Sequence, residues 1–282
     1  MALNGIILIN KARGVSSNSV VTKVQRLLNV KTAGHLGTLD VLGEGLLPIA
    51  LGKGTKLFDY FLNKDKIYKT VFKFGETTAT LDLEGEITQS NEVDISLNDV
   101  KTAAEKFVGK QNQMPPAYSA KKINGQKAYD IARVGQEVNL HPKEIEIYSI
   151  KVLKKLDKNV FELEVHCSSG TYIRSLCRDI AKELSTYGVM LSIQRTKCGN
   201  FYINNSFTIQ DVENDKYEII PLDEVFDFET IKVDEISEQM LLNGVKIKSN
   251  KKDSLLKVFG KSGFLGVGEV SDEKLKLKLR LI

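Results

Sequence analysis

The sequence predicts an α+β fold in which helices flank a mixed, largely antiparallel sheet, with a small β-barrel-like domain after it. Along the first 230 residues, segments with strand periodicity and segments with helix periodicity follow one another irregularly, without a repeating strand–helix–strand unit. Beyond residue 230 the pattern changes to short strands separated by glycine turns. The chain has 282 residues, which suits one large domain or two unequal ones.

The first elements are a strand over residues 6–9 and a helix that begins at Ser16 or Ser17. Serine is a preferred N-cap residue, and the apolar side chains after it recur at helical spacing. Residues 34–54 are rich in glycine and are expected to form a loop around a short apolar core. Residues 67–74 alternate between apolar and lysine side chains, which predicts a half-buried strand with Tyr68 on its apolar face.

The later elements follow from the same two periodicities. Apolar positions between residues 100 and 108 indicate a helix, and alternation over 161–167 predicts another half-buried strand. Ser168, Ser169 and Gly170 end that strand, and a helical stripe runs from Ile173 to Leu184. In the tail, strands are expected over 255–259, 263–270 and 275–282. A barrel of that size is marginal alone, so we expect it to lean on its neighbour.

Composition restricts the class of protein. Hydrophobic residues make up 42% of the chain and charged residues 27%, as in an ordinary globular protein. The longest apolar run, residues 46–51, contains Pro48 and is too short to cross a bilayer, and the N-terminus lacks a signal-peptide layout. Three cysteines without a CxxC pair predict neither a disulfide framework nor a zinc site. We therefore expect a cytoplasmic protein that has no membrane partner and no metal.

The net charge of +4 conceals a strong segregation along the chain. Residues 1–75 carry +7, residues 110–135 carry +4 and residues 231–282 carry +4, whereas residues 76–109 carry −6 and residues 200–230 carry −7. Separate basic blocks suit a polyanion that contacts several patches, and solvated protein faces are the alternative.

Four segments contain candidate functional residues. Asp40 lies in the glycine-rich stretch 34–48, where it either forms a turn or reacts. Arg174 follows a glycine break in the first turn of a helix, a position where the helix dipole disfavours a cation, so it either has a carboxylate partner or is an exposed surface residue. Tyr68 packs in a core or contacts a ligand. Residues 113–125 combine prolines, lysines and Tyr118, a composition typical of an RNA-contacting loop or of a plain solvated one.

In this order and spacing, the segments resemble the bacterial tRNA pseudouridine-55 synthases of the TruB type. The segments GHLGTLD (residues 34–40), QMPPAYSAKKINGQKAYDIAR (113–133) and SSGTYIRSL (168–176) carry the resemblance. It extends from about residue 5 to residue 201 and is weaker over the tail. The resemblance implies a pseudouridine synthase fold over residues 1–230, with a thumb-like RNA-contacting insertion at 110–135. It also implies a short PUA-like RNA-binding domain over residues 231–282.

The resemblance further implies a reaction and a set of residues. The reaction is isomerisation of uridine to pseudouridine at position 55 in the T-loop of tRNA, by base flipping followed by cleavage of one glycosidic bond and formation of another. An isomerisation needs no cofactor, and we expect tRNA as the partner, no obligatory protein partner and a monomer. The catalytic residues implied are Asp40, Tyr68 as the stacking ring, and Arg174 as the partner of Asp40. The RNA-binding residues expected are Lys11, Gly14, His35, Lys121, Lys122, Ile193 and Arg195.

Three positions depart from the family pattern. Ala12 and Val41 stand where the family has proline, and Gln194 stands where it has the first arginine of an Arg-Arg-Thr stretch. The first two change loop stiffness, because proline would fix φ, and the third removes one phosphate contact. Affinity for the substrate is therefore the property that these departures are expected to affect.

Competing interpretations remain at the level of sequence. A non-catalytic RNA-binding or tRNA-folding protein on the same scaffold would share the basic blocks, although the intact set of Asp40, Tyr68 and Arg174 favours the enzyme. A glycosidase-like hydrolase would use Asp40 and Glu44 as paired carboxylates. The last alternative is a subunit of an RNA-modifying complex that finds its target through a guide RNA. Whether Asp40 attacks C1′, adds to C6 or removes a 2′ proton is also open.

Overall fold

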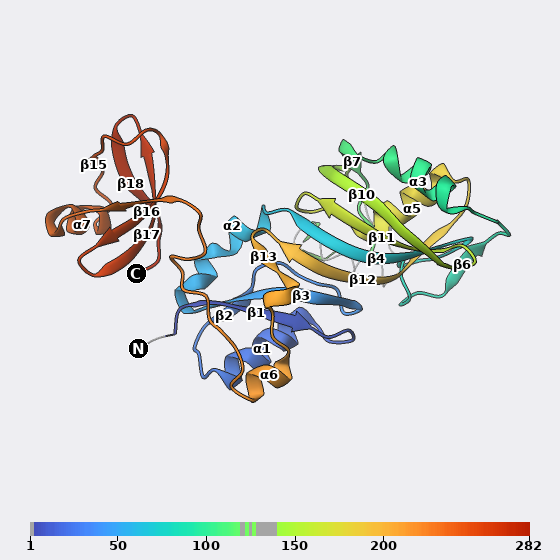
Figure 1. Cartoon of the computed structure of the whole chain (residues 1–282), viewed down its shortest axis with the longest axis horizontal. Coiled ribbons are helices and arrows are strands. Elements are labelled where there is room, and N and C mark those ends of the chain that lie inside the picture. Colours follow the sequence, from blue (N-terminus) through green and yellow to red (C-terminus); the bar gives the residue numbers. More distant parts are fainter. Residues whose placement is uncertain (1–2, 119–121, 124–125, 128–139) are drawn as a thin grey trace.

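A computed structural model describes residues 3–118, 122–123, 126–127 and 140–282, and its described part is built on a large mixed sheet (Figure 1). The strands of this sheet are β1 (Gly5–Lys11), β2 (Ala33–His35), β3 (Gly43–Leu51), β4 (Lys66–Phe74), β7 (Gly109–Gln113), β10 (Lys143–Asp157), β11 (Val160–Cys167), β12 (Gly188–Cys198) and β13 (Phe201–Tyr202). Their order is β1-β3-β12-β4-β11-β10-β7, with β2 beside β3 and β13 beside β12. The β3–β12 pair is parallel and the other pairs are antiparallel, which confirms the predicted fold class.

In the described part of the chain, helices α1 (Ser17–Leu27), α3 (Leu97–Glu105) and α5 (Ile173–Glu183) cover this sheet. Helix α1 begins where the Ser16 side chain accepts a hydrogen bond from the Ser19 amide, and its buried valines pack against β1 and β3. Helices α3 and α5 pack together on β4, β10 and β11 at the other end of the sheet. Shorter turns complete this part: η1 (Gly52–Leu57), α2 (Phe58–Leu62), η2 (Ile203–Asn205) and α6 (Ile209–Glu213).

The stretch from residue 34 to residue 54 differs from the predicted loop, because residues 43–51 form strand β3 and residues 34–35 belong to β2. Every side chain of β3 except that of Glu44 is buried, since β1, β2 and β12 flank the strand and cores lie on both of its faces. A strand buried on both faces lacks the alternation of polar and apolar residues that identifies a half-buried strand. Because β3 gives no such alternation, its glycines and Pro48 suggest a loop, and the predicted loop is wrong for this strand.

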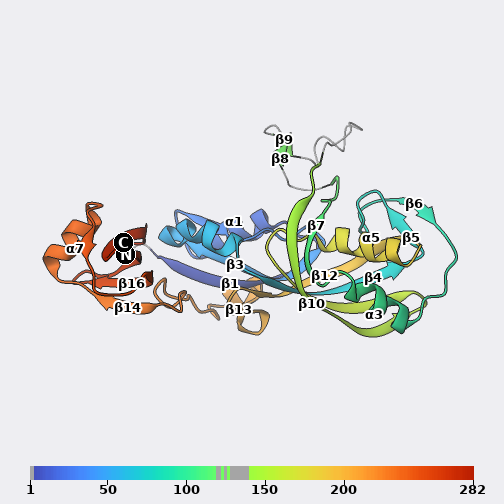
Figure 2. The same ribbon diagram turned by 90° about the horizontal axis from the view of Figure 1, so that it is seen from above.

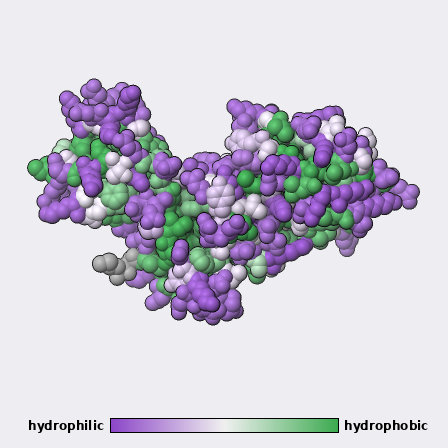
Figure 3. Space-filling view, viewed as in Figure 1, coloured by the Kyte–Doolittle hydropathy of each residue, from purple (hydrophilic) through white to green (hydrophobic). Residues whose placement is uncertain are grey.

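A second sheet begins at the end of the acidic stretch 200–230, so the predicted boundary at residue 230 falls within its first strand. It contains β14 (Glu229–Lys232), β15 (Ile247–Lys248), β16 (Ser254–Gly260), β17 (Gly263–Ser271) and β18 (Lys274–Arg280), in the order β14-β16-β17-β18-β15, with helix α7 (Glu235–Leu242) beside it. Val267 and Leu281 of this part pack in one cluster with Ile6 and Phe226, so the small sheet does lean on the rest of the chain. Figure 3 shows hydrophobic residues gathered near this junction, with polar residues over most of the same face.

Two small hairpins project from this framework. Strands β5 (Glu76–Thr78) and β6 (Ile87–Ser90) form one of them, and β8 (Lys122–Ile123) and β9 (Gln126–Lys127) form the other. Figure 2 shows β8 and β9 projecting from the end of the β7–β10 pair, away from the large sheet. Much of the predicted insertion 110–135, including Lys121, lies outside the described residues. No helix in the described ranges has both the length and the apolar character needed to span a membrane.

Candidate active site

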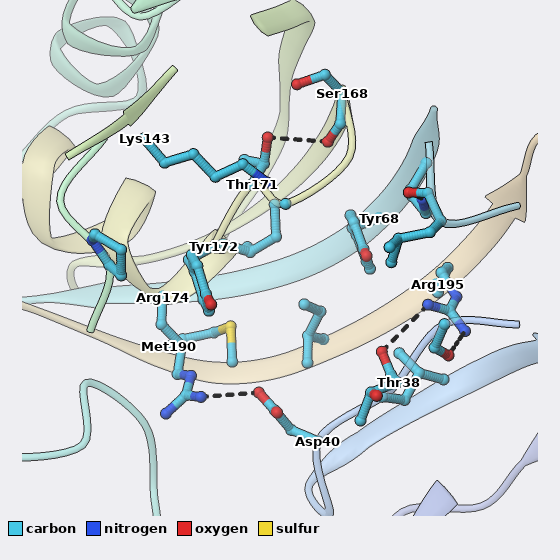
Figure 4. Close-up of a pocket in the computed structure, with 18 residues that line it drawn as sticks. Thr38, Asp40, Tyr68, Lys143, Ser168, Thr171, Tyr172, Arg174, Met190 and Arg195 are labelled. Carbon is cyan, nitrogen blue, oxygen red and sulfur yellow. Dashed lines mark hydrogen bonds and ion pairs between the residues drawn. The ribbon is translucent and has the colours of Figure 1, made fainter. Parts of the chain in front are cut away.

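A pocket of about 700 Å³ lies between the loop that carries Asp40 and the start of helix α5 (Figure 4). Strands β4 and β12 contribute to its wall, because Tyr68 of β4 and Arg195 of β12 are paired neighbours in the sheet. The lining residues are Gly37, Thr38, Leu39, Asp40, Leu62, Lys66, Tyr68, Pro115, Lys143, Ser168, Gly170, Thr171, Tyr172, Ile173, Arg174, Met190, Ile193 and Arg195. The structure thus brings five of the residues that the sequence singles out into one cavity, although they come from four separate segments.

Asp40 and Arg174 form an ion pair across the pocket. The Arg174 Nη2 lies 3.0 Å from the Asp40 Oδ2, and Figure 4 shows the two side chains pointing toward each other. The Asp40 side chain remains 54% exposed, whereas that of Arg174 is buried. The carboxylate is therefore fixed by a cation on one side and open to a ligand on the other.

Asp82 is a second partner of Arg174, and the sequence offered no signal for it. Its Oδ2 lies 3.1 Å from the Arg174 Nη1, which also donates to the Thr80 carbonyl at 3.0 Å. The Asp82 side chain is only 6% exposed, and its Oδ1 accepts from the Thr80 hydroxyl at 2.6 Å and from the Glu84 amide at 3.0 Å. A buried carboxylate held in this way explains how a buried cation is tolerated in the first turn of α5.

Arg195 braces the loop of residues 37–43, which we call the Asp40 loop. Its Nε donates to the Leu46 carbonyl at 2.8 Å, its Nη2 to the Gly37 carbonyl at 3.0 Å and its Nη1 to the Thr38 carbonyl at 3.4 Å. The side chain is 1% exposed. Three of its N–H groups donate to backbone oxygens, so Arg195 supports the loop, and its RNA contact stays a prediction.

Lys11 and Ser17 hold the same loop from the other side. The Ser17 hydroxyl donates to the Leu39 carbonyl at 2.8 Å and accepts from the Leu39 amide at 2.9 Å. The Lys11 Nζ donates to the carbonyls of Val15 at 2.7 Å and Val41 at 3.4 Å. Lys11 is 1% exposed, so its side chain has no surface to offer RNA, contrary to the expectation from the sequence. Burial lowers the pKa of Lys11, and Asp40 and Glu44 oppose that shift.

Tyr68 forms part of the pocket wall, half-buried on β4 between Arg195 of β12 and Val165 of β11. Burial raises the pKa of its hydroxyl to about 12, with a smaller opposing effect from Arg195. The phenol is therefore protonated at neutral pH rather than present as a phenolate. Its ring faces the same cavity as Asp40, as Figure 4 shows.

The remaining predicted residues are spread around this centre. Ile193 lines the pocket, whereas His35 and Gly14 do not. His35 lies half-buried on β2, its Nδ1 has no hydrogen-bond partner in the described structure, and burial followed by the charge of Arg195 lowers its pKa. Gly14 adopts φ of +86° and its amide donates to the Val41 carbonyl at 2.8 Å. Lys122 belongs to β8, but its side chain is not described. Lys121 lies outside the described residues.

Glu44 does not share the cavity with Asp40. It lies on β3 opposite Gln194 of β12 and is absent from the residues that line the pocket. A glycosidase-like pair needs both carboxyl groups to flank the same bond, so the arrangement around Asp40 gives no support to that interpretation.

Comparison with known proteins yields one family. Residues 25–173 match the model of the TruB family pseudouridylate synthases, N-terminal domain. A protein named tRNA pseudouridine synthase B from Caldanaerobacter subterraneus subsp. tengcongensis is 36% identical, with 99% of each chain covered. One of the same name from Clostridium tetani is 38% identical, covering 99% of this chain and 100% of its own.

Solved structures agree at the level of fold. The chain resembles one in a crystal structure of a Cbf5-Nop10-Gar1 complex with a TM-score of 0.73 and 19% identity, covering 99% of this chain and 85% of the other. It also resembles one in an H/ACA RNP bound to a substrate RNA, with a TM-score of 0.72 and 19% identity, at the same coverage. Identity at that level shows the fold alone. Because the family model spans more than half of the chain and the relatives align over nearly all of it, this chain belongs to the TruB family of pseudouridylate synthases.

Proposed function

We infer that this chain isomerises uridine to pseudouridine in tRNA, and we propose that its target is the uridine at position 55 in the T-loop. Its relatives at 36–38% identity are named tRNA pseudouridine synthase B. The single observation that carries the proposal is the Asp40 carboxylate, which is held 3.0 Å from Arg174 and is still open to a nucleotide-sized cavity.

The substrate base must leave its stack before it can react. A uridine inside a folded RNA loop is flipped into the pocket at a cost of a few kcal/mol. Tyr68 offers an aromatic surface in the wall of that pocket, and stacking of the uracil on it recovers part of this cost. Ile193 and Met190 supply apolar contacts beside it. We therefore propose that Tyr68 and Ile193 hold the flipped base while its ribose lies toward Asp40.

The reaction rearranges two bonds and one proton. The N1–C1′ bond breaks, the uracil turns, a C5–C1′ bond forms, the C5 hydrogen leaves as a proton and N1 gains one, so no atoms are gained or lost. We propose that Asp40 acts in this sequence as nucleophile or base, with Arg174 keeping the carboxylate in place, and that Tyr68 relays the C5 proton. The Asp40 loop is braced by Arg195, Ser17 and Lys11, so Asp40 is positioned before the substrate arrives.

Conversion of an unmodified tRNA transcript by the purified chain alone tests this function. We expect pseudouridine at position 55, without any other protein or added cofactor. The Cbf5 structure is a complex with Nop10 and Gar1, so activity of the purified chain alone also tests the proposal that this chain needs no other protein. Absence of pseudouridine from a folded transcript, with the protein shown to be folded, would contradict the proposal.

Replacing Tyr68 with phenylalanine is expected to separate stacking from proton transfer. The ring still stacks, so the dissociation constant for tRNA should change less than about threefold, whereas the single-turnover rate should fall at least about 100-fold. The hydroxyl, with a pKa of about 12, is protonated through pH 9, so this loss should be the same between pH 7 and pH 9. The Tyr68→Leu variant, which lacks the ring as well, is the comparison. A near wild-type rate for Tyr68→Phe would restrict Tyr68 to stacking.

We further propose that residues 1–230 form the catalytic domain and residues 231–282 an RNA-binding domain. Lys246, Lys248 and Lys252 are exposed in this tail and, in the described structure, have no ion-pair partner. Replacing all three with alanine should raise the dissociation constant for tRNA and flatten its salt dependence, because each lost phosphate contact lowers the slope by about 0.7–0.9. The single-turnover rate at saturating enzyme should not change. An unaltered salt slope would show that this surface does not contact RNA.

A further inference from the structure

Four cations line the described part of the pocket, and three of them already make hydrogen bonds or ion pairs within the protein. Arg174 donates to Asp40, Asp82 and Thr80, and Arg195 donates to three backbone carbonyls of the Asp40 loop and β3. Lys66 donates to the carbonyls of three residues in and after α2, and burial lowers its pKa. All three cations already donate to groups that hold the pocket together.

Lys143 is the exception among the described residues that line the cavity. It is the first residue of β10, it is exposed, and its ammonium makes no hydrogen bond or ion pair with any described residue. Figure 4 shows it beside Thr171, with the cavity between it and Asp40. The pocket thus has a neutralised end, where Asp40 faces Arg174, and an opposite end with an uncompensated positive charge.

Gly170 leaves the space that the Lys143 side chain occupies. A Cβ at this position would overlap the Lys143 ammonium, and Gly170 also has φ of +76°, a conformation that other residues rarely adopt. The side chain of Lys143 therefore lies across the 168–171 turn, which places the ammonium over the rim of the cavity. The ammonium and the end of the stem lie against Gly170, and the ammonium has no hydrogen-bond or ion-pair partner among the described residues.

We propose that Lys143 binds a backbone phosphate of the substrate RNA next to the flipped nucleotide. This inference rests on the proposed function, because the flipped nucleotide is what brings RNA to this pocket. The strand on either side of a flipped nucleotide must leave the pocket across its rim, and each flanking nucleotide carries a backbone phosphate. Among the described residues that line the pocket, Lys143 is the cation whose donors are free, and a lysine binds phosphate as a compact point charge.

Replacing Lys143 with methionine is the sharpest test, because methionine retains an unbranched stem over Gly170 and removes only the charge. We expect the slope of log K against log salt for tRNA binding to fall by about 0.7–0.9 and the dissociation constant to rise at low salt. The single-turnover rate at saturating enzyme should change less than about threefold, and Lys143→Arg should restore affinity. The matched control is Lys151→Met on the same strand, where the lysine pairs with Glu164 at 3.1 Å, and its slope should not change.

A substrate series identifies the phosphate itself. Neutral methylphosphonate linkages, introduced one at a time around position 55, should weaken wild-type binding at one linkage and leave Lys143→Met unaffected at that same linkage. Equal losses for both proteins at every linkage, or an unchanged salt slope, would overturn the proposal. A slower single-turnover rate with unchanged affinity would also overturn it, because Lys143 would then act on the reaction. If the wild-type protein made no pseudouridine yet showed the linkage-specific effect, the phosphate contact would stand and the proposed function would fail.

Discussion

Replacing Asp40 with asparagine is expected to abolish pseudouridine formation while tRNA binding and the fold persist. Asparagine has nearly the same shape but no negative charge, so it cannot act as nucleophile or base at the nucleotide. We expect the single-turnover rate to fall by at least about 10⁴-fold, which corresponds to about 5 kcal/mol in the barrier. The measurement is single-turnover conversion of tRNA with enzyme in excess, alongside a binding titration.

Stability should change little in this variant, because the Asp40 side chain is half exposed and Arg174 keeps Asp82 as its partner. A half-exposed ion pair contributes about 1 kcal/mol or less. Glu44→Gln is the matched control, since Glu44 is the neighbouring carboxylate on β3 and does not line the pocket; it should retain activity. Product from Asp40→Asn at more than a trace rate, or an equal loss in Glu44→Gln, would remove Asp40 from the chemistry.

Replacing Arg174 with methionine is expected to cost both stability and activity. Asp82 would be left as a buried carboxylate without its cation, and breaking a buried ion pair in this way destabilises proteins by about 3–5 kcal/mol. Asp40 would also lose the group that holds it over the cavity. We expect a lower free energy of unfolding in denaturant titrations and no measurable turnover.

A second substitution separates these two effects. Adding Asp82→Asn to Arg174→Met removes the uncompensated charge, so at least half of the lost stability should return, since the amide oxygen can still accept from the Thr80 hydroxyl and the Glu84 amide. Activity should not return, because Asp40 still lacks its partner. Recovery of turnover in the double variant would mean that Arg174 is needed only to neutralise Asp82.

The fold could be predicted as a class, and the exceptions have physical causes. Strands β4 and β11 each have one buried face, so their alternation identified them, as did the apolar stripe of α5. Strand β3 was mistaken for loop because it is buried on both faces and begins with Gly43 and Gly45. Local periodicity reports the number of buried faces, and a segment without a polar face gives no periodic signal.

From the sequence, site residues could be predicted only where they belong to a segment that matches a family motif. Asp40, Tyr68 and Arg174 came from segments that resemble a family, and they line one cavity. Asp82 and Lys143 were missed because their roles arise from contacts with Arg174 and Gly170, which are distant in sequence. Lys11 and Arg195 were expected as RNA contacts because they match motifs of the family, and a motif does not report whether a side chain is buried. Their burial follows from the Asp40 loop, whose carbonyls have few backbone partners and need buried donors.

Release of tritium from C5 of the target uridine tests most directly whether this pocket isomerises uridine 55. Joining C5 to C1′ expels the C5 hydrogen, so tRNA made with C5-tritiated uridine should release tritium to water upon pseudouridine formation. We expect one equivalent per tRNA with the wild-type protein in excess, none with Asp40→Asn, and none when cytidine replaces uridine 55. Release that is independent of position 55, or that persists in Asp40→Asn, would contradict the assignment of this site and its target.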